Sequence, residues 1–522
     1  MKKRHIWAVL SVLAAYFVML GLLVYAESFS PDASIVTLKD ALWYSVVTLT
    51  TVGYGDLSPV TALGKIIGGV FLLLSTSLLA MLVVLLMTFG QVWVRFRLGF
   101  AQSRQWFIFS ALNPATHRLA TGVAKENPKA VLVFPKDDDS NKPLTSDLKK
   151  LGAFFVKGAV DDMLALKKSI SGVNLFFMAE DGYTNYRDAL AFSGKGCHIY
   201  CQSDFSPQST PVDITVFSTA ENCARLYWRT NPLSQSAATV AIIGTGEYLE
   251  AILAQALQVN LFSPQQSICY HIFAGDDRFI KLHPQLSQMV SVDETAPDRD
   301  SLIFHTDRWE DNINIIKSAD RVILCGDTDD ENLKIFDTLT KYFVINGDIH
   351  LRLDNDMPGV YSFGNHSRLY TPGVVMRTTL TKTAVAMHQI YLDSTGATGP
   401  TWEQLSPFTR GSNVSAADHL LTKIRILLED DTVTDITGDI CLAAFEKYNR
   451  SKPEKADFYR HLEHNRWMRF HALYNWVYSP DRDNSRRMHS SMVPFEMLDK
   501  TTQIKDDYSW QLLQQLAGFL KE

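Results

Sequence analysis

Two long apolar stretches near the start of the chain differ from everything that follows them. Residues 6–26 and 62–94 are almost wholly apolar, whereas the sequence beyond residue 100 alternates between short apolar runs and polar segments. About 20 consecutive apolar residues are needed to cross the hydrocarbon core of a bilayer. We therefore expect two membrane-spanning helices, followed by a large portion with the pattern of a water-soluble protein.

The charges that flank the two stretches predict their orientation. Basic residues gather on the cytoplasmic side of membrane helices, so both termini are expected in the cytoplasm and residues 27–61 outside or re-entrant. The first stretch has the basic start of a signal peptide but is too long for one and lacks a small-x-small cleavage site. We expect a multi-pass protein of the cell (inner) membrane. The flanking basic residues are Lys2, Lys3, Arg4, Arg95, Arg97 and Arg104.

Between the two stretches lies a short segment with the pattern of a re-entrant loop. Residues 41–50 are helical in pattern but too few to cross a bilayer, and Thr51-Val-Gly-Tyr-Gly-Asp56 follows them. Irregular backbone at membrane depth occurs only where it lines a water-filled path or is buried in protein. Four copies of such a loop, with the carbonyls of Thr51, Val52, Gly53 and Tyr54 directed at one axis, replace the hydration shell of potassium.

From Thr48 to Asp56 the segment matches the pattern T-x-x-T-x-G-Y-G-D and resembles the potassium-channel signature. The resemblance implies a homotetramer in contact with membrane lipid, with potassium ions held at the four carbonyl-bearing positions. Only one span precedes the loop, and it carries no arginine repeat, so we expect no voltage sensor. The selectivity filter implied by the signature consists of Thr51, Val52, Gly53, Tyr54, Gly55 and Asp56.

The composition of the chain argues against a nucleic-acid partner and indicates a reduced compartment. The chain is 46% apolar and 20% charged with a net charge of −6, and it has no basic stripe with interleaved aromatic residues, so we expect no nucleic-acid partner. All six cysteines follow residue 196 and none forms a CxxC pair, which is typical of a reduced compartment.

After residue 104 the pattern alternates twice between strand and helix, which predicts two doubly wound parallel sheets. The first alternation has Ser110, Leu112 and Ala115 where a phosphate-binding turn would need glycines. The second runs from a strand at 239–243 into Gly244-Thr245-Gly246 and a helix. This is the order of a dinucleotide-binding half-fold, in which a glycine turn lets phosphate approach a helix N-terminus.

These two units resemble the RCK domains, regulators of potassium conductance that accompany many channels with this kind of pore. The resemblance implies a ligand-sensing ring with NAD(H) or an adenine nucleotide, or calcium, as the candidate small-molecule or ion ligand. The cofactor-binding residues that it implies are Gly244, Thr245, Gly246, Asp276 and Asp277. The acidic clusters considered for calcium are Asp137–Asp139, Asp161-Asp162, Asp327–Glu331 and Glu429–Asp431.

Beyond residue 400 the pattern becomes helical, with an E-H-x-R-W core at residues 463–467 and a V-P-F-x-x-L segment at 493–498. This region resembles the small helical repeat of ryanodine receptors (RyR). Glu463, His464, Arg466 and Trp467 form a candidate ligand site, with Arg466 as an anion clamp and Trp467 as a stacking surface. The open alternatives are a satisfied helix–helix contact and a surface ion pair.

The expected fold is therefore multidomain, with an all-α transmembrane pore domain, two α/β Rossmann-like RCK units and a C-terminal α-helical RyR-like module. The expected function is a tetrameric potassium channel gated by a nucleotide or a divalent cation. The alternative is a sensor protein whose main role is signal- or stress-triggered potassium flux through the RyR-like module. No catalytic constellation follows the glycine turn, so an enzyme is not expected. The expected domains cover residues 1–98, 99–104 (a linker), 105–235, 236–395 and 396–522.

Overall fold

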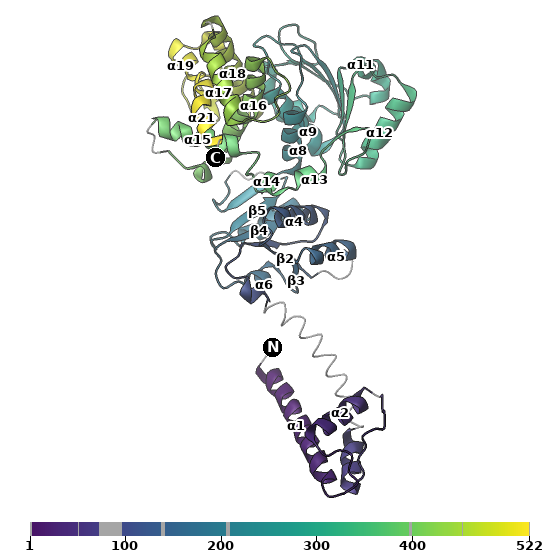
Figure 1. The fold of residues 1–522 in the computed structure, drawn as a ribbon. Helices are drawn as coiled ribbons and strands as arrows, with labels where there is room; N and C mark the ends of the chain where they lie inside the picture. Colours follow the sequence, from purple (N-terminus) through teal and green to yellow (C-terminus); the bar gives the residue numbers. More distant parts are fainter. Residues whose placement is uncertain are drawn as a thin grey trace. The chain divides into compact units, whose positions relative to one another are not determined.

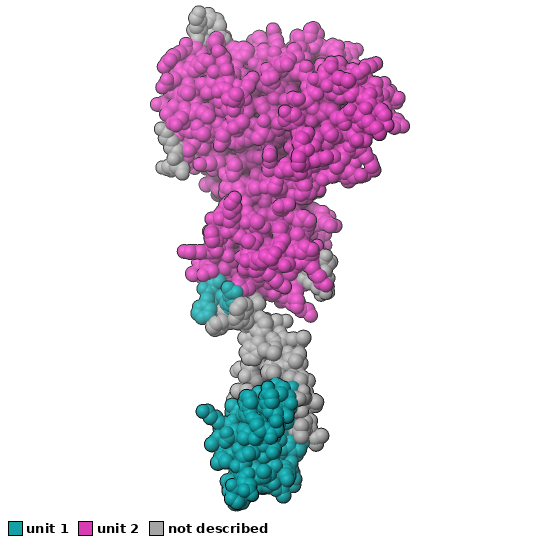
Figure 2. Space-filling model, turned by 45° about the vertical axis from the view of Figure 1, so that its right-hand side comes forward, with its two compact units in different colours: residues 1–101 teal, residues 102–522 magenta. Residues whose placement is uncertain are grey.

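The computed structural model divides the chain into two compact units, Met1–Ala101 and Gln102–Glu522 (Figure 2). The structure describes residues 3–50, 52–71, 97–136, 141–204, 209–395, 399–451 and 453–520.

The first unit consists of helices around a loop. Helix α1 (Lys3–Glu27) packs against α2 (Leu38–Leu49), and the chain is helical again at residues 62–71 and 97–100. Helix α2 begins with a capping box, in which Thr37 and Asp40 exchange side-chain-to-backbone hydrogen bonds and satisfy N–H groups of the first turn.

The structure describes the first expected membrane span but only the start of the second. Among the described residues, no helix combines the length and the apolar character needed to cross a bilayer. Most of the expected second span, from residue 72 to residue 94, lies outside the described residues.

The second unit begins with a six-stranded parallel sheet in the order β3-β2-β1-β4-β5-β6. Its central strands β1, β2 and β4 are buried along nearly their whole length, as strands covered by helices on both faces must be. Its strands are β1 (Trp106–Phe109), β2 (Val131–Pro135), β3 (Phe154–Val156), β4 (Val173–Phe177), β5 (His198–Gln202) and β6 (Ile214–Phe217). Its helices are α4 (Pro114–Glu126), α5 (Lys142–Lys150), α6 (Val160–Leu164) and α7 (Gly182–Leu190).

A second parallel sheet follows, in the order β13-β12-β11-β7-β8-β10-β9. The reversal between β7 and β11 is the topological switch point of a doubly wound fold, where ligands bind outside the carboxyl ends of the strands. Its strands are β7 (Thr239–Ile243), β8 (Cys269–Phe273), β9 (Ser291–Val292), β10 (Ser301–Phe304), β11 (Arg321–Leu324), β12 (Asp348–Arg352) and β13 (Tyr361–Phe363). Its helical elements are α9 (Gly246–Val259), α10 (Arg278–Leu282), η1 (Pro284–Gln288), η2 (Trp309–Asn312), α11 (Ile313–Ser318) and α12 (Asp329–Tyr342).

The two sheets are joined by exchanged elements and share one hydrophobic core. Helix α8 (Thr219–Thr230) follows the first sheet but packs on α9, and Trp228 donates a hydrogen bond to the carbonyl of Ile252 at 2.8 Å. In return, α13 (His366–Leu369) and α14 (Pro372–Val375) follow the second sheet and pack on α4. A Cβ added to Gly122 would lie 2.7 Å from Pro372, so this contact is close enough to require a glycine.

The C-terminal helices form a third layer beside α8 and α9 (Figure 1). Their core includes Ala384, Met387 and Ile390 of α15, a helix that the sequence analysis assigned to the second Rossmann-like unit. The elements are α15 (Lys382–Thr395), η3 (Trp402–Gln404), α16 (Pro407–Leu428), α17 (Gly438–Asn449), α18 (Pro453–Leu473), β14 (Val477–Tyr478), β15 (Met488–His489), η4 (Phe495–Met497), α19 (Lys500–Lys505), α20 (Tyr508–Gln511) and α21 (Leu513–Leu520).

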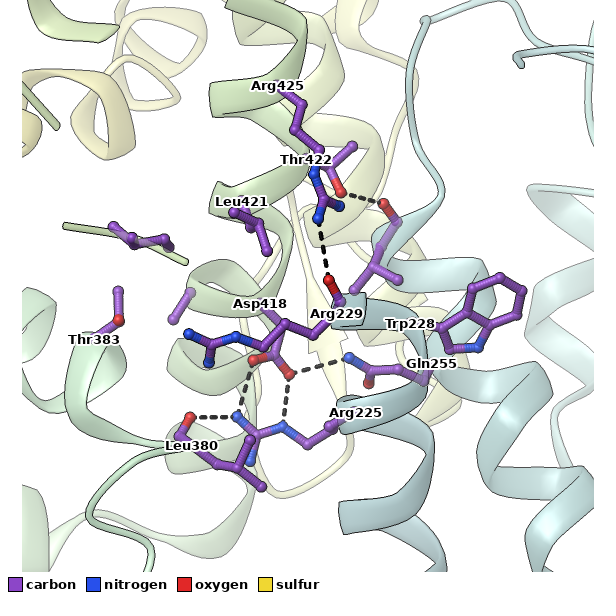
Figure 3. Close-up of a pocket in the computed structure, with 13 residues that line it drawn as sticks. Arg225, Trp228, Arg229, Gln255, Leu380, Thr383, Asp418, Leu421, Thr422 and Arg425 are labelled. Atoms are coloured by element: carbon purple, nitrogen blue, oxygen red, sulfur yellow. Dashed lines mark hydrogen bonds and ion pairs between the residues drawn. The ribbon is translucent and has the colours of Figure 1, made fainter. Parts of the chain in front are cut away.

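Polar contacts fasten these helices to α8 and α9 (Figure 3). Arg225 of α8 donates to both carboxylate oxygens of Asp418 at 2.7 and 2.9 Å. Thr422 donates to the carbonyl of Val259 at 2.8 Å, and Arg425 donates to the carbonyl of Arg229 at 3.0 Å. A cavity of about 30 Å³ remains between them, which leaves room for about one water molecule.

Candidate functional site

The loop after α2 has the backbone that a carbonyl filter requires. Gly53 and Gly55 have φ angles of +58° and +74°, in the left-handed region that favours glycine. The amide groups of Val52 and Gly53 both donate to the carbonyl of Val47, at 3.1 and 3.3 Å, which ties the loop to the end of the short helix. Thr51, the first residue of the expected filter, lies outside the described residues.

Aromatic and acidic side chains hold the outer half of this loop. The indole N–H of Trp43 on α2 donates to the carboxylate of Asp56 at 2.8 Å. The rings of Trp43 and Tyr54 lie parallel, with their centroids 6.2 Å apart. The helix before the loop therefore holds both Tyr54 and Asp56, two residues of the expected filter.

Glu27 fixes the segment that follows the expected filter. Its carboxylate is fully buried and accepts hydrogen bonds from the amides of Val60 and Thr61 at 2.9 and 3.0 Å. It also accepts one from the Thr61 hydroxyl at 2.8 Å. Glu27 thereby fixes the segment just before the helix that begins at residue 62, where the Thr61 hydroxyl caps the first turn by accepting a hydrogen bond from the amide of Gly64 at 2.9 Å.

In the second Rossmann-like sheet, the glycine turn lies at the carboxyl end of β7, as expected. Gly246 has φ +75°, and a Cβ added to Gly244 would lie 2.7 Å from the backbone of Cys325 and Gly326. Thr245, the residue before α9, makes no side-chain cap. The turn thus has two features of a phosphate-binding turn. Gly244 has no room for a side chain, and the N-terminus of α9 has no side-chain cap.

The side chains around the turn are acidic. A Cβ on Gly246 would lie 2.5 Å from a carboxylate oxygen of Asp327, so this carboxylate lies against the turn. Glu247 adds a second acidic side chain in the first turn of α9. These carboxylates repel a phosphate, so the turn fits a nucleotide by its backbone but not by its charge.

The structure does not join Asp276 and Asp277 to the glycine turn through any contact among the described residues. Asp276 accepts a hydrogen bond from the amide of Arg278 at 3.1 Å, and Asp277 pairs with Lys281 at 2.7 Å. Both acids thus stabilise the start of α10. The next residue, Arg278, pairs with Glu250 of α9 at 3.4 Å.

The first Rossmann-like unit has a different turn, as the missing glycines predicted. Asn113 caps α4 through a capping box with Thr116, whose amide donates to the Asn113 side chain at 2.9 Å. The Ser110 hydroxyl accepts a hydrogen bond from the amide of Met178 at 3.3 Å. The amide at the third helical position is therefore already bonded to a side chain of this unit.

The acidic clusters considered for calcium have protein partners in the structure. Within the described parts of the chain, no group of three or more histidine, cysteine or acidic residues could hold a metal ion. The expected cluster Asp137–Asp139 lies outside the described residues. The partners are Lys195 for Asp161, the amide of Ala159 for Asp162, Arg352 for Asp329, Lys334 for Asp330, Lys447 for Glu429 and Thr432 for Asp430.

In the C-terminal module, Glu463 and Arg466 form a buried ion pair instead of the surface pair considered from the sequence. The Arg466 guanidinium donates to Glu463 at 2.7 Å and to the Ser415 hydroxyl at 3.0 Å, and its side chain is 3% exposed. Lys423 pairs with the same carboxylate. Burial acts to raise the pKa of Glu463, but the charges of Arg466 and Lys423 outweigh it and hold that pKa well below its usual range.

His464 and Trp467 are packed within the same module. His464 Nε2 lies 2.8 Å from the carbonyl of Val493, in the V-P-F segment that the sequence analysis singled out. The Trp467 ring lies 3.9 Å from that of His471 and 4.9 Å from that of His489, centroid to centroid. For Arg466 to bind an anion, its guanidinium would have to break its hydrogen bonds to Glu463 and Ser415.

Sequence reasoning missed the polar contacts between segments far apart in the chain. These include Arg225 with Asp418 and Arg469 with Asp300. No local pattern marks such pairs, because their members are brought together only by the packing of different elements.

Comparison with known proteins supports the pore assignment. Residues 8–92 match the ion channel family. The chain is 51% identical over 53 residues to a voltage-gated potassium channel of Aeropyrum pernix, covering 10% of this chain and 18% of that protein. It is 40% identical over 62 residues to the human potassium voltage-gated channel subfamily A member 4, covering 11% of this chain and 10% of that protein.

The chain thus spans less than a fifth of the length of these curated relatives. The matched family consists of ion channels, and both relatives are named as potassium channels. Among solved structures, the GsuK channel aligns over 70% of this chain and 95% of that chain, with 13% identity and a TM-score of 0.37.

Proposed function

We propose that the chain is a subunit of a tetrameric, potassium-selective membrane channel that is gated by its cytoplasmic portion. The observation that carries this proposal is the loop at residues 52–56, with left-handed backbone at Gly53 and Gly55 and with Trp43 bonded to Asp56. The match of residues 8–92 to the ion channel family supports it.

Selectivity in this proposal comes from the backbone. Alternating left-handed glycines let successive carbonyl groups face one axis, where four chains replace the hydration shell of a potassium ion. Helix α2 ends immediately before the loop, so its partial negative charge lies beside the path of the cation. The bond between Trp43 and Asp56 keeps the outer end of the loop in place while ions pass.

Gating in this proposal comes from the Rossmann-like sheets. Four chains carry eight such sheets, two from each, which is enough for a closed ring in the cytoplasm. The shared core and the exchanged elements α8, α13 and α14 couple each pair of sheets. A ligand that acts at the switch point beside Gly244 would shift both sheets and pull on the pore through residues 97–104.

Reconstituted bilayers test the pore proposal. We expect the purified protein to conduct potassium in strong preference to sodium, and Gly53→Ala to abolish that preference, because a side chain at φ +58° is strained. Gly21→Ala is the matched control, since a Cβ at Gly21 has no heavy atom within 4 Å. Equal sodium and potassium currents through the unmutated protein would disprove the proposal.

A further inference from the structure

A second cavity lies at the amino ends of the strands of the second sheet, at the opposite edge from the glycine turn. It is lined by residues 233–235 and 238 before β7, residues 319–321 at the start of β11 and residues 346–348 at the start of β12. Its volume is about 300 Å³, whereas the cavity beside Arg225 has about 30 Å³. Since ligand pockets typically have about 300–1,000 Å³, this cavity is large enough for a small molecule.

Close contacts hold the walls of this cavity in place. The carboxylate of Asp320 accepts a hydrogen bond from the amide of Thr239 at 2.7 Å, and the Arg321 guanidinium donates to the carbonyl of Asn231 at 2.7 Å. A Cβ added to Gly347 would lie 2.2 Å from the carbonyl oxygen of Asp320, so the starts of β11 and β12 are in direct backbone contact. The cavity is therefore preformed, and a ligand would lose little free energy in ordering it.

The charge of the lining favours a cation. Asp320 and Asp348 are the acids among the ten lining residues, and Arg321 is the cation. The guanidinium of Arg321 is bonded to two backbone carbonyls. Helix α8 ends at Thr230, shortly before the lining segment, and the C-terminal end of a helix carries a partial negative charge. An anion would meet two carboxylates, whereas a cation is attracted by both.

The positions of the two aspartates favour an amine with two charges. Asp348 of β12 is in register with Arg321 of β11, and Asp320 directly precedes Arg321. The aspartates thus stand at the ends of adjacent strands, which lie about 5 Å apart. Asn346 and Gln235 add amide oxygens to the lining. An ammonium group has three N–H donors and no acceptor, so it matches a lining of this kind.

We propose that this cavity binds a small organic dication of the amine class, with one ammonium group at Asp320 and the other at Asp348. The chain segment between α8 and β7 lines the cavity and connects the first Rossmann-like unit to the second sheet. A bound diamine would hold this segment against the starts of β11 and β12 and restrict movement between the two units. The site is separate from the glycine turn, and its effect on gating rests on the proposed function.

Isothermal titration calorimetry on the purified full-length protein tests the site, with 1,4-diaminobutane as the probe. At about 0.15 M salt, where exposed charges more than about 8 Å apart are screened, we expect saturable binding. The neutral 1,4-butanediol, of the same length, should not bind. Asp320→Asn and Asp348→Asn should each weaken binding of the diamine by about fivefold, as expected for the loss of one partly exposed ion pair.

Two variants separate this site from a general attraction to acidic surface. Ser234 is an exposed lining residue, so Ser234→Trp would fill the cavity without changing its charge and should abolish binding while the protein stays folded. Asp188→Asn, at a surface pair with Arg187 on α7, removes the same charge elsewhere and should leave the affinity unchanged.

Hydrogen exchange on the full-length protein shows whether the ligand acts on the connecting segment. Saturating diamine should raise the protection of amides at residues 233–238, and Asp348→Asn should reduce this effect at the same diamine concentration. A wild-type protein that does not bind the diamine would overturn the proposal. So would a Ser234→Trp variant that binds it as tightly as the wild type, or protection that does not change at saturation. These measurements need no ion conduction, so their failure is distinct from a loss of potassium selectivity.

Discussion

Single side-chain contacts hold the irregular segments of the first unit. Glu27 accepts three hydrogen bonds just before the helix that follows the expected filter, and Trp43 donates one to Asp56. Glu27 supplies partners to backbone amides that no helix satisfies, and a buried group left without its partner costs about 1–3 kcal/mol. The sequence predicts a filter at residues 51–56 from a local pattern. It did not indicate Glu27, whose partners lie more than 30 residues away.

Gly64 should be essential because of this carboxylate. A Cβ at Gly64 would lie 2.0 Å from Glu27 Oε1, so Gly64→Ala must displace the carboxylate from Val60 and Thr61. We expect the free energy of unfolding to fall by about 1–3 kcal/mol, seen as a lower melting temperature of the purified protein.

The same helix provides the control for this substitution. Gly69 has no heavy atom within 4 Å of an added Cβ, so Gly69→Ala should be neutral or slightly stabilising, because alanine favours a helix. Equal effects of the two substitutions would show that the contact with Glu27 does not explain the requirement at Gly64.

Among the secondary-structure elements, the strands were the most predictable. A short apolar run indicated the strand at 239–243, and the structure places β7 at those residues. Helix α15 was less predictable, because its apolar face suits either neighbour. Ala384 and Ile390 pack with α16 and α21, so tertiary packing, which no local pattern encodes, decides the layer to which this helix belongs.

Asp300 is expected to be a critical contact between two of these elements. It is fully buried before β10 and accepts hydrogen bonds from Arg469 of α18 at 2.7 Å and from the amide of Ile268 at 2.8 Å. Asp300→Asn would leave the Arg469 guanidinium buried without a counter-charge. We expect a loss of about 3–5 kcal/mol in the free energy of unfolding, measured by denaturant titration.

A neighbouring aspartate is the control for that experiment, because it carries the same charge but is exposed. Asp298 is exposed and pairs only with Arg299, at 3.5 Å, so Asp298→Asn should change stability by less than about 0.5 kcal/mol. If Asp300→Asn were equally mild, the contact with Arg469 would not be the one that fastens α18 to the second sheet.

Taken as a whole, residues 102–522 form one compact unit, in which the C-terminal helices pack against α8 and α9. They supply the carboxylate that pairs with Arg225 and the arginine that pairs with Asp300. The sequence indicated that these helices exist and suggested a sensor at Glu463, His464, Arg466 and Trp467. It could not indicate that Arg466 is buried against Glu463 and Ser415, because that depends on how α16 and α18 pack.

If the C-terminal helices and the second sheet form one unit, α8, α9 and α16 should unfold together in a single local opening. Arg225 is 10% exposed and Asp418 17%, so Arg225→Met leaves a largely buried carboxylate without its guanidinium. That should lower the free energy of opening by up to about 3 kcal/mol. In hydrogen exchange on the full-length protein, amides of all three helices should lose the same amount of protection, because the pair holds them in one cooperative unit.

Two further variants determine what such a result means. Asp418→Leu combined with Arg225→Met removes both charges and should recover much of the loss, since a buried ion pair is often replaceable by apolar side chains. Arg187→Met, at a surface pair on α7, should leave the protection of all three helices unchanged. If Arg225→Met loosened α16 alone while α8 and α9 kept their protection, the C-terminal helices would be a separate domain resting on the second sheet. A signal received there would then have no rigid route to the sheets, because it could be absorbed by movement at this contact.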